Sequence, residues 1–239
     1  MVEPPILPLI VKNASVRRGR KVLIGPVTLT LAPTGLTVIM GPNGAGKSTL
    51  LRLLHGMERV SGGSIHWQVS EPEARKRQSF VFQTPIMMRR KAIDNVAYPL
   101  LVHGVDRRLA RQKAIDWLDR VGLSDSADKQ APVLSGGERQ KLALARALIR
   151  DPDILFLDEP CANLDGRATR ELEDLVLAAY ENGTRIVMAT HDIGQARRLA
   201  RDVLFIYRGK VHEAALAPLF FSDPQTREAR AFVRGDIVE

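Results

Sequence analysis

Hydrophobic positions along the chain follow three different patterns. Short runs that are almost wholly apolar predict strands buried on both faces, strict alternation predicts half-buried strands, and a spacing of three to four predicts helices. The buried runs are 37–40, 154–157 and 186–189. The alternating segments are 27–31 and 65–69, and the helical ones are 110–121 and 169–181. The chain is therefore predicted to have an α/β fold.

The order of these segments predicts how they are organised. The early chain is rich in strands, residues 92–150 are predicted to be helical, and the rest alternates strand, helix, strand. Such alternation predicts a parallel sheet, because parallel strands need a crossover connection. Residues 203–207 and Lys210-Val211, separated by Arg208-Gly209, predict a hairpin at an edge.

Composition indicates an intracellular globular protein. The chain has 239 residues, of which 45% are hydrophobic, and one cysteine, Cys161. That is enough apolar material for a core without disulfides, and a single cysteine fits a reducing compartment. We find neither a signal-peptide pattern at the N-terminus nor a run of about 18 apolar residues, so we expect a cytoplasmic chain that does not cross a membrane by itself.

The net charge of +8 is scattered over several short clusters. Most of them are expected to be solvated faces of helices and turns. Attraction to anionic lipid head groups or to nucleic acid is the alternative. Because aromatic residues do not interleave with the clusters, base stacking is not favoured. We therefore expect no nucleic-acid partner and prefer a membrane surface.

A glycine-rich loop follows the first buried run and precedes a helical pattern. Its spacing, G-x-x-x-x-G-K-[ST], is typical of a loop whose backbone amides surround nucleotide phosphates. The loop is Gly41, Pro42, Asn43, Gly44, Ala45, Gly46, Lys47 and Ser48, with Thr49 next in the ATP-binding set. Lys47 is expected to reach the terminal phosphates, and the Ser48 hydroxyl to bind Mg²⁺. A chance glycine-rich turn is disfavoured by the strand before it and the helix after it.

Two carboxylates end the buried run 154–157. Asp158 and Glu159 would lie beside the phosphate loop, because ligands of open α/β sheets bind at the carboxyl ends of the strands. Asp158 is the candidate for holding Mg²⁺ through its water shell, and Glu159 for polarising the attacking water as a general base. A solvent-exposed acidic turn is the alternative.

The segment Leu134-Ser135-Gly136-Gly137-Glu138 precedes another helical pattern. Ser135 and Glu138 have the spacing of a capping box. Capping does not explain two consecutive glycines, which weaken a first helical turn but leave its amides open to a docking group. A second phosphate-facing helix terminus suggests two nucleotide contacts.

These residues together resemble the ATP-binding subunit of an ATP-binding cassette (ABC) transporter. In chain order the motifs are Gly41 to Ser48, Gln83, Leu134 to Glu138 followed by Arg139-Gln140, Asp158-Glu159-Pro160, Ala162-Asn163-Leu164-Asp165 and Thr190-His191-Asp192. They look like the family's Walker A, Q-loop, signature, Walker B, D-loop and H-loop. The ordered set covers nearly the whole chain and is far more specific than any single motif.

The resemblance implies a P-loop NTPase core with a mixed or parallel sheet, an N-terminal antiparallel β-subdomain and an inserted α-helical subdomain. We expect one ABC ATPase domain over 1–239. Segments 1–84 and 151–239 would supply the β-subdomain and the core, and about 85–150 the helical subdomain with the signature.

The resemblance also implies a head-to-tail homodimer that hydrolyses ATP with Mg²⁺. ATP would lie between the phosphate loop of one subunit and Ser135, Gly136, Gly137 and Glu138 of the other. Glu159 would be the base, and His191 would contact the γ-phosphate and orient Glu159 and water. Gln83 would contact Mg²⁺ and water while sensing the membrane partner, and Asp165 would link the two sites.

Two positions depart from the family's pattern. The family usually stacks an aromatic residue on adenine from the loop before the first hairpin, where this chain has Val16-Arg17-Arg18-Gly19. Arg17 or Arg18 could lie on the purine by cation–π stacking, or both could face water. Cys161 stands where the family more often has Thr or Ser, and we interpret it as a buried small thiol.

Transport would require permease subunits in the membrane, with an indirect periplasmic or extracellular solute-binding partner. The family docks a permease helix at the segment 83–90, where Met87 and Met88 are either an adaptable contact or core residues. The chain would then lie at the cytoplasmic face of the inner membrane. The 48 residues after His191 are too few for an appended regulatory β-domain, which predicts a bare cassette.

The likeness is greatest to ATPases of bacterial tungstate-type and phosphate-type oxyanion importers. It is carried by 81–85, 94–98 and the tail from Phe220-Phe221 to Gly235. A polar amino-acid importer or an exporter remains an alternative, and so does a nucleotide-binding regulator outside transport. DNA-repair and translation-factor cassettes are disfavoured, since they need a long coiled coil or a second cassette.

Overall fold

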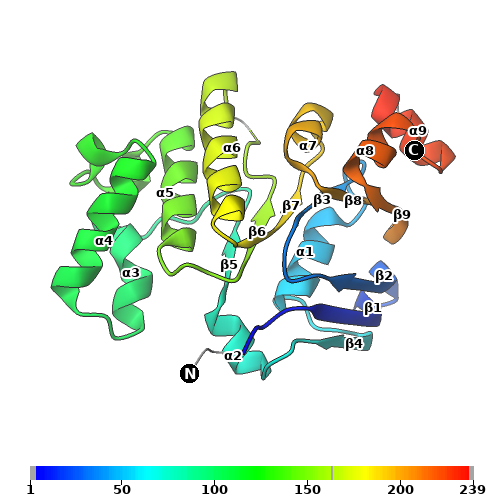
Figure 1. Ribbon diagram of the computed structural model, residues 1–239, viewed down its shortest axis with the longest axis horizontal. Helices are drawn as coiled ribbons and strands as arrows, with labels where there is room; N and C mark the ends of the chain where they lie inside the picture. Colours follow the sequence, from blue (N-terminus) through cyan, green and yellow to red (C-terminus); the bar gives the residue numbers. More distant parts are fainter. Residues whose placement is uncertain (1–3, 163, 237–239) are drawn as a thin grey trace.

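A six-stranded sheet forms the centre of the computed structural model, which describes residues 4–162 and 164–236 (Figure 1). The strand order is β5-β6-β7-β3-β8-β9, and only β9, at one edge, runs antiparallel to its neighbour. The strands are β3 (Leu36–Met40), β5 (Gln78–Val81), β6 (Ile154–Asp158), β7 (Arg185–Ala189), β8 (Asp202–Tyr207) and β9 (Lys210–Leu216). The α/β class with a mixed sheet is confirmed.

The central strands are apolar on both faces because both faces are covered. In β3, the side chains of Val38 and Met40 join one apolar cluster and that of Ile39 joins another. The same alternation places Phe156 of β6 in the second cluster and its neighbour Leu157 in the first. Continuous apolar runs are the pattern of parallel strands covered on both sides.

A smaller antiparallel sheet covers one side of the core. Its order is β2-β1-β4, with β1 (Leu9–Arg18), β2 (Lys21–Leu31) and β4 (Gly62–His66). Helix α1 (Lys47–His55) lies between the two sheets, with Leu50, Leu51, Leu53 and Leu54 fully buried. The predicted N-terminal antiparallel sheet is therefore present.

The opposite face of the central sheet is covered by helices from the later part of the chain (Figure 1). They are α5 (Gly136–Leu148), α6 (Gly166–Glu181), α7 (Ile193–Leu199), α8 (Ala217–Ser222) and α9 (Arg227–Arg234). The short helix α2 (Glu71–Lys76) precedes β5 on the other side. The described part of the chain starts near the end of α2, where the carbonyl oxygen of Pro4 accepts a hydrogen bond from Arg77, and it finishes just after α9.

Helices α3 and α4 stand at one end of the molecule, beside α5. They and two 3₁₀ turns are α3 (Ala92–Val102), α4 (Arg107–Arg120), η1 (Ser124–Ser126) and η2 (Ala131–Val133). This group has an apolar cluster of its own that includes Ile93, Leu118 and Leu142. The division of the chain near residues 84 and 150 stays a prediction, and this separate cluster is consistent with it.

Some predicted boundaries were wrong. Within the alternating segment 65–69, the strand β4 ends at His66. Among the described strands β4 pairs only with β1, and the residues after it lead into α2. The side chains of Trp67 and Val69 still pack against the apolar cluster that contains Ile39 and Phe156. The helix predicted over 169–181 begins at Gly166, since the Asp165 carboxylate accepts a hydrogen bond from the Ala168 amide and caps it.

Among the described residues, no helix combines the length and the apolar character needed to cross a membrane.

Burial of His55 makes stability depend on pH. Its ring meets Phe80 and Phe156 edge-on at 5.4 and 5.6 Å. Burial, aided by the charge of Arg75, lowers the pKa of His55 from 6.5 to about 4. The unfolded chain therefore binds more protons between these pH values, so stability is lost as pH falls below 6.5.

We expect the free energy of unfolding to fall by about 2 kcal/mol between pH 7.5 and pH 5 through this group alone. Urea unfolding at both pH values measures it. The variant His55→Phe keeps an aromatic ring that cannot be protonated and should lose that share of the dependence. An equal pH dependence in both proteins would contradict this prediction.

Candidate nucleotide-binding and catalytic site

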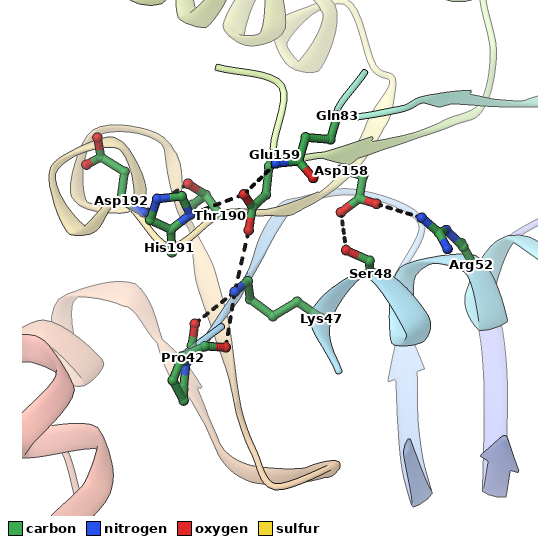
Figure 2. A network of polar contacts seen from close by, with 11 residues as sticks. Pro42, Lys47, Ser48, Arg52, Gln83, Asp158, Glu159, Thr190, His191 and Asp192 are labelled. Carbon is green, nitrogen blue, oxygen red and sulfur yellow. Dashed lines mark hydrogen bonds and ion pairs between the residues drawn. The ribbon is translucent and has the colours of Figure 1, made fainter. Parts of the chain in front are cut away.

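Four parallel strands end at the same edge of the central sheet, and each is followed by candidate site residues (Figure 2). Strand β3 leads into the glycine-rich loop and β5 into Gln83. Strand β6 leads into Glu159 and β7 into His191. The structure thus brings together side chains from four segments that are far apart in the sequence.

The glycine-rich loop has the conformation that its glycines allow. Gly41 has φ +144°, and a Cβ there would lie 2.1 Å from the carbonyl oxygen of Ile206, so no other residue fits. Gly46 has φ +110° and is the N-cap from which α1 starts at Lys47. Residues other than glycine rarely adopt these backbone angles, which explains why the loop needs glycine at both positions.

The ammonium of Lys47 is enclosed by oxygen atoms. Its Nζ donates to the carbonyl oxygens of Gly41 at 3.0 Å and Pro42 at 3.3 Å, and lies 3.5 Å from Glu159 Oε1. The side chain is only 5% exposed. A buried cation needs such partners. Phosphate oxygens could replace the carboxylate in this arrangement.

Ser48 and Asp158 form an oxygen-rich pair beside the loop. The Ser48 hydroxyl donates to Asp158 Oδ1 at 2.7 Å, and Asp158 is 2% exposed. Burial raises the pKa of Asp158, although the bond from Ser48 and the charge of Arg52 oppose the rise. A hydroxyl and a carboxylate at this spacing suit a small hard cation such as Mg²⁺.

Arg52 is a functional candidate that the sequence analysis missed. It lies one helical turn after Ser48 on α1, and a guanidinium nitrogen is 3.6 Å from Asp158 Oδ2. Its Nε is buried without a hydrogen-bond partner. The only sequence signal for Arg52 was its position four residues after Ser48. The local sequence does not indicate which strand end α1 faces.

Glu159 is held at the centre of the site in a strained backbone conformation. Its φ is +46°, which is uncommon for a residue other than glycine. The Glu159 amide donates to the carbonyl oxygen of Ala189 at 2.9 Å. Its Oε2 accepts from Gln83 Nε2 at 3.3 Å and lies 3.2 Å from His191 Nδ1. The side chains of the three candidates therefore lie next to one another within a single subunit: Gln83, Glu159 and His191 (Figure 2).

The segment around His191 is fixed by short-range hydrogen bonds. The Asp192 amide donates to the Thr190 hydroxyl at 3.1 Å. The Asp192 carboxylate accepts from the Gln195 amide at 2.8 Å and caps α7. His191 is thus carried on a turn between the end of β7 and the start of α7.

The signature residues lie in a different groove. Ser135 and Glu138 form the predicted capping box of α5, and their mutual hydrogen bonds lower the pKa of Glu138. Asp165, at the start of α6, lines the same groove. Gly136 and Gly137 lie between them on its wall. Among the described residues, no hydrogen bond or ion pair joins this groove to residues 41–49 of the same chain.

Arg17 lies at the end of β1, opposite Val22 of β2. The next residue on β2, Leu23, has its carbonyl oxygen against the loop at Gly46. Arg17 is exposed, and its backbone amide donates to the Ser61 hydroxyl. This end of the small sheet therefore adjoins the glycine-rich loop.

The β8–β9 turn is a second contact that the sequence analysis missed. The Gly209 amide donates to the carbonyl oxygen of Ala45 at 3.0 Å. The β8–β9 turn thus supports the glycine-rich loop through this backbone hydrogen bond.

Four other sequence positions have a mixed outcome. Cys161 packs against the main core, and burial raises the pKa of its thiol to about 11, as expected of an unreactive small thiol. Met87 is partly buried and packs against two apolar clusters. Met88 lines a surface groove between β5, α3 and α5. Asn163 of the D-loop motif lies outside the described residues.

The chain belongs to the ABC transporter family. A sequence model of that family, described as ABC transporter, matches residues 24–162. The chain is therefore an ABC ATPase, an ATP-hydrolysing transporter subunit. The predicted family and the predicted enzyme class are confirmed.

Relatives with assigned transport roles cover most of the chain. It is 40% identical to phosphate import ATP-binding protein PstB 2 of Natronomonas pharaonis, over 89% of this chain and 81% of that one. It is 35% identical to the tungstate uptake system ATP-binding protein TupC of Peptoclostridium acidaminophilum, over 85% and 96%. A solved dimeric ATP-binding cassette bound to ADP and Pi superposes with TM-score 0.79 at 26% identity, over 87% and 98%.

The burial of Asp158 predicts a conflict between stability and ligand binding. Because its folded pKa is raised, the ionised carboxylate costs stability at neutral pH in the free protein, and that cost grows as pH rises through the pKa. We expect Asp158→Asn to raise the midpoint of thermal unfolding, by roughly 2–4 °C for each kcal/mol gained.

The same variant should show a smaller rise of the midpoint on adding Mg²⁺ and ATP than the wild type shows. Thermal unfolding with and without the two ligands measures both effects. Asp116→Asn, an exposed change of the same kind on α4, should alter neither. A destabilised free variant, or an undiminished ligand effect, would contradict the prediction.

Proposed function

We propose that this chain works as one of two identical ATPase subunits that drive permease subunits, importing an oxyanion. The observation that carries the proposal is the meeting of Lys47, Asp158 and Glu159 with Gln83 and His191 at one sheet edge. That set supplies a phosphate-binding cation, an oxygen pair for Mg²⁺ and a carboxylate with two polar neighbours. These are the parts needed for phosphoryl transfer to water.

The glycine-rich loop would bind the phosphates through its amides, from Gly41 to Ser48 and Thr49. Lys47 would exchange its contact with Glu159 for one with the terminal phosphates. Ser48, Asp158 and Gln83 would hold Mg²⁺, which neutralises charge on the β- and γ-phosphates when bound. Arg17 would stack on adenine, since the end of β1 adjoins the loop.

Glu159 would act as the general base on the attacking water. It is the carboxylate that both Gln83 and His191 already reach, at 3.3 and 3.2 Å. His191 would orient Glu159 and water and contact the γ-phosphate, where charge is redistributed in the transition state. Gln83 would report the state of this site to the membrane partner.

Each chain holds only half of the contacts that this reaction needs. The groove with Ser135, Gly136, Gly137 and Glu138 carries a helix N-terminus with open amides, yet within the described part of the chain no hydrogen bond or ion pair joins it to its own glycine-rich loop. An anion is favoured at such a terminus. We therefore assign these residues to the ATP of a second copy, in a head-to-tail homodimer with Asp165 linking the two sites.

The groove that contains Met88 is the proposed permease contact. Tyr98 and Val102 of α3 also line it, and Val102 is 60% exposed. Nearby Ile86 is 73% exposed, and its carbonyl oxygen accepts from Arg146 at 2.9 Å. Exposed apolar side chains beside a groove fit docking of a partner helix. Docking there would place the chain at the cytoplasmic face of the inner membrane.

Oxyanion import is proposed because the phosphate and tungstate relatives reach 40% and 35% identity. A second cargo class is favoured by nearly equal likeness to methionine import ATP-binding protein MetN 2 of Staphylococcus epidermidis, at 33%. The cargo would be bound by the permease and a solute-binding protein, so this part of the proposal rests on family analogy.

Removing the base tests the catalytic assignment. We expect Glu159→Gln to lower the rate of ATP hydrolysis by about 10²–10⁴-fold, the usual contribution of a general base, without weakening ATP binding. Phosphate release and ATP binding measured on the same preparation check both. A rate equal to that of the wild type would favour a nucleotide-binding regulator instead.

The same variant tests the dimer. With ATP retained, Glu159→Gln should accumulate as a dimer in size-exclusion chromatography with light scattering. Adding Gly136→Asp should keep it monomeric, because the new carboxylate would repel the partner's triphosphate. A Cβ at Gly136 meets nothing within 4 Å, so the chain itself has room for the change. Unchanged dimerisation would contradict the assignment of the signature groove.

Isolation of the native complex tests the partners and the cargo. We expect membrane permease subunits to copurify with the wild-type chain and to be lost with Val102→Asp, while basal ATPase activity persists. Transport of radiolabelled phosphate, tungstate and methionine by the reconstituted complex then distinguishes the cargo classes. Retention of the permease by Val102→Asp would remove the groove from the proposal.

A further inference from the structure

An ion pair outside the site, between a buried carboxylate and a half-exposed guanidinium, joins the two helices that follow the D-loop and the H-loop motifs. Glu173 lies on α6 and is 4% exposed. Its Oε2 accepts from Arg198 Nε at 2.7 Å and its Oε1 from Arg198 NH2 at 2.6 Å. This bidentate geometry is the strongest that an arginine and a carboxylate can form, and it fixes direction as well as distance.

Two more groups complete this cluster. Gln195, which is 2% exposed, donates from Nε2 to Glu173 Oε1 at 3.3 Å. The hydrogen bonds that Arg198 donates to Glu173 raise the pKa of the Arg198 guanidinium, which is about half exposed to solvent. Cys161, two residues after Glu159, borders Gln195. The carboxylate of Glu173 therefore has three donors, and both of its partners come from α7.

Helix α7 depends on such an anchor. It has seven residues, and a helix of that length is unstable without tertiary contacts. Gln195 is tied to its start, because the Gln195 amide donates to Asp192, the N-cap. His191 immediately precedes that cap. A shift of α7 along α6 would thus move the imidazole that lies 3.2 Å from Glu159.

We propose that Glu173 is a positioning residue for ATP hydrolysis, which acts through Arg198 and Gln195 on α7 and holds His191 against Glu159. This inference rests on the proposed role of His191. Because Asp165 is the N-cap of α6, the same pair fixes the spacing between the D-loop and the H-loop. Glu173 touches neither the nucleotide nor the reacting water in this assignment.

The first test is Glu173→Gln in the full chain. The amide of glutamine has nearly the same shape as the carboxylate of Glu173. It is uncharged, however, and cannot accept both hydrogen bonds that the guanidinium donates. We expect kcat to fall about tenfold, since small misplacements of catalytic groups have effects of this order or larger. The KM for ATP should change less than twofold, because the glycine-rich loop is untouched.

A double-mutant cycle with His191→Ala separates positioning from general loss of structure. If Glu173 acts through His191, Glu173→Gln should not slow hydrolysis further once the imidazole is gone. Single-turnover measurements with protein in excess keep the slow variants measurable. An equal slowing in both backgrounds would overturn the positioning role and leave the role of His191 intact.

Failure of the underlying proposal has a different result. If His191→Ala alone leaves kcat unchanged, the catalytic role of His191 fails, and the inference about Glu173 fails with it. If Glu173→Gln alone leaves kcat unchanged while His191→Ala lowers it, only the inference about Glu173 is overturned.

Matched variants control for stability. Asp153→Asn weakens a second bidentate pair, that of Asp153 with Arg77. This pair lies just before β5 and β6, at the strand ends away from the candidate site. Asp153→Asn should lower the thermal midpoint without changing kcat. Should Glu173→Gln not fold, Arg198→Lys enters the same cycle. Lysine keeps the positive charge but cannot form the bidentate contact of arginine. We therefore expect Arg198→Lys to lower kcat when His191 is present and to leave kcat unchanged in the His191→Ala background. Any fall of kcat in the His191→Ala background would overturn the proposal.

Discussion

A sheet that is buried on both faces leaves its strand ends as the place for charge. Residues such as Val38 and Ile39 alternate between two apolar clusters, so neither face can hold an unpaired ionised group. The carboxyl ends of β3, β5, β6 and β7 open at one edge, and there Lys47, Asp158 and Glu159 are found. The chemistry of the site follows from that constraint, because charges excluded from the core meet where the strands stop.

Charges at this edge are paired with one another in the free protein. Lys47 faces carbonyl oxygens and Glu159, and Asp158 accepts from Ser48 and lies near Arg52. Binding of a nucleotide and Mg²⁺ would exchange these internal partners for phosphate oxygens and a cation. In the proposed function, the other half of the phosphate contacts comes from a second copy, so nucleotide binding and dimer formation become one event.

Three surfaces of the chain then have separate tasks. In the proposed function, the strand ends would carry the hydrolytic groups, the groove at Ser135 would face the partner's nucleotide, and the groove at Met88 would face the membrane subunit. Helices α6 and α7 connect the first two, since Asp165 caps the start of α6 and α7 follows His191. The bidentate pair of Glu173 and Arg198 gives that connection a defined geometry.

The sequence by itself determined the local structure and the family. The glycine-rich loop, the buried runs, the capping box of Ser135 and Glu138 and the ordered motifs are all encoded in short spacings, and the fold class and family are confirmed. Only the tertiary structure decided that Arg52 faces Asp158, that the turn at Gly209 supports the loop, that Met87 packs against two apolar clusters and that Glu173 pairs with Arg198. Such contacts depend on strand order and helix packing, which bring together residues whose separation along the chain carries no periodic signal.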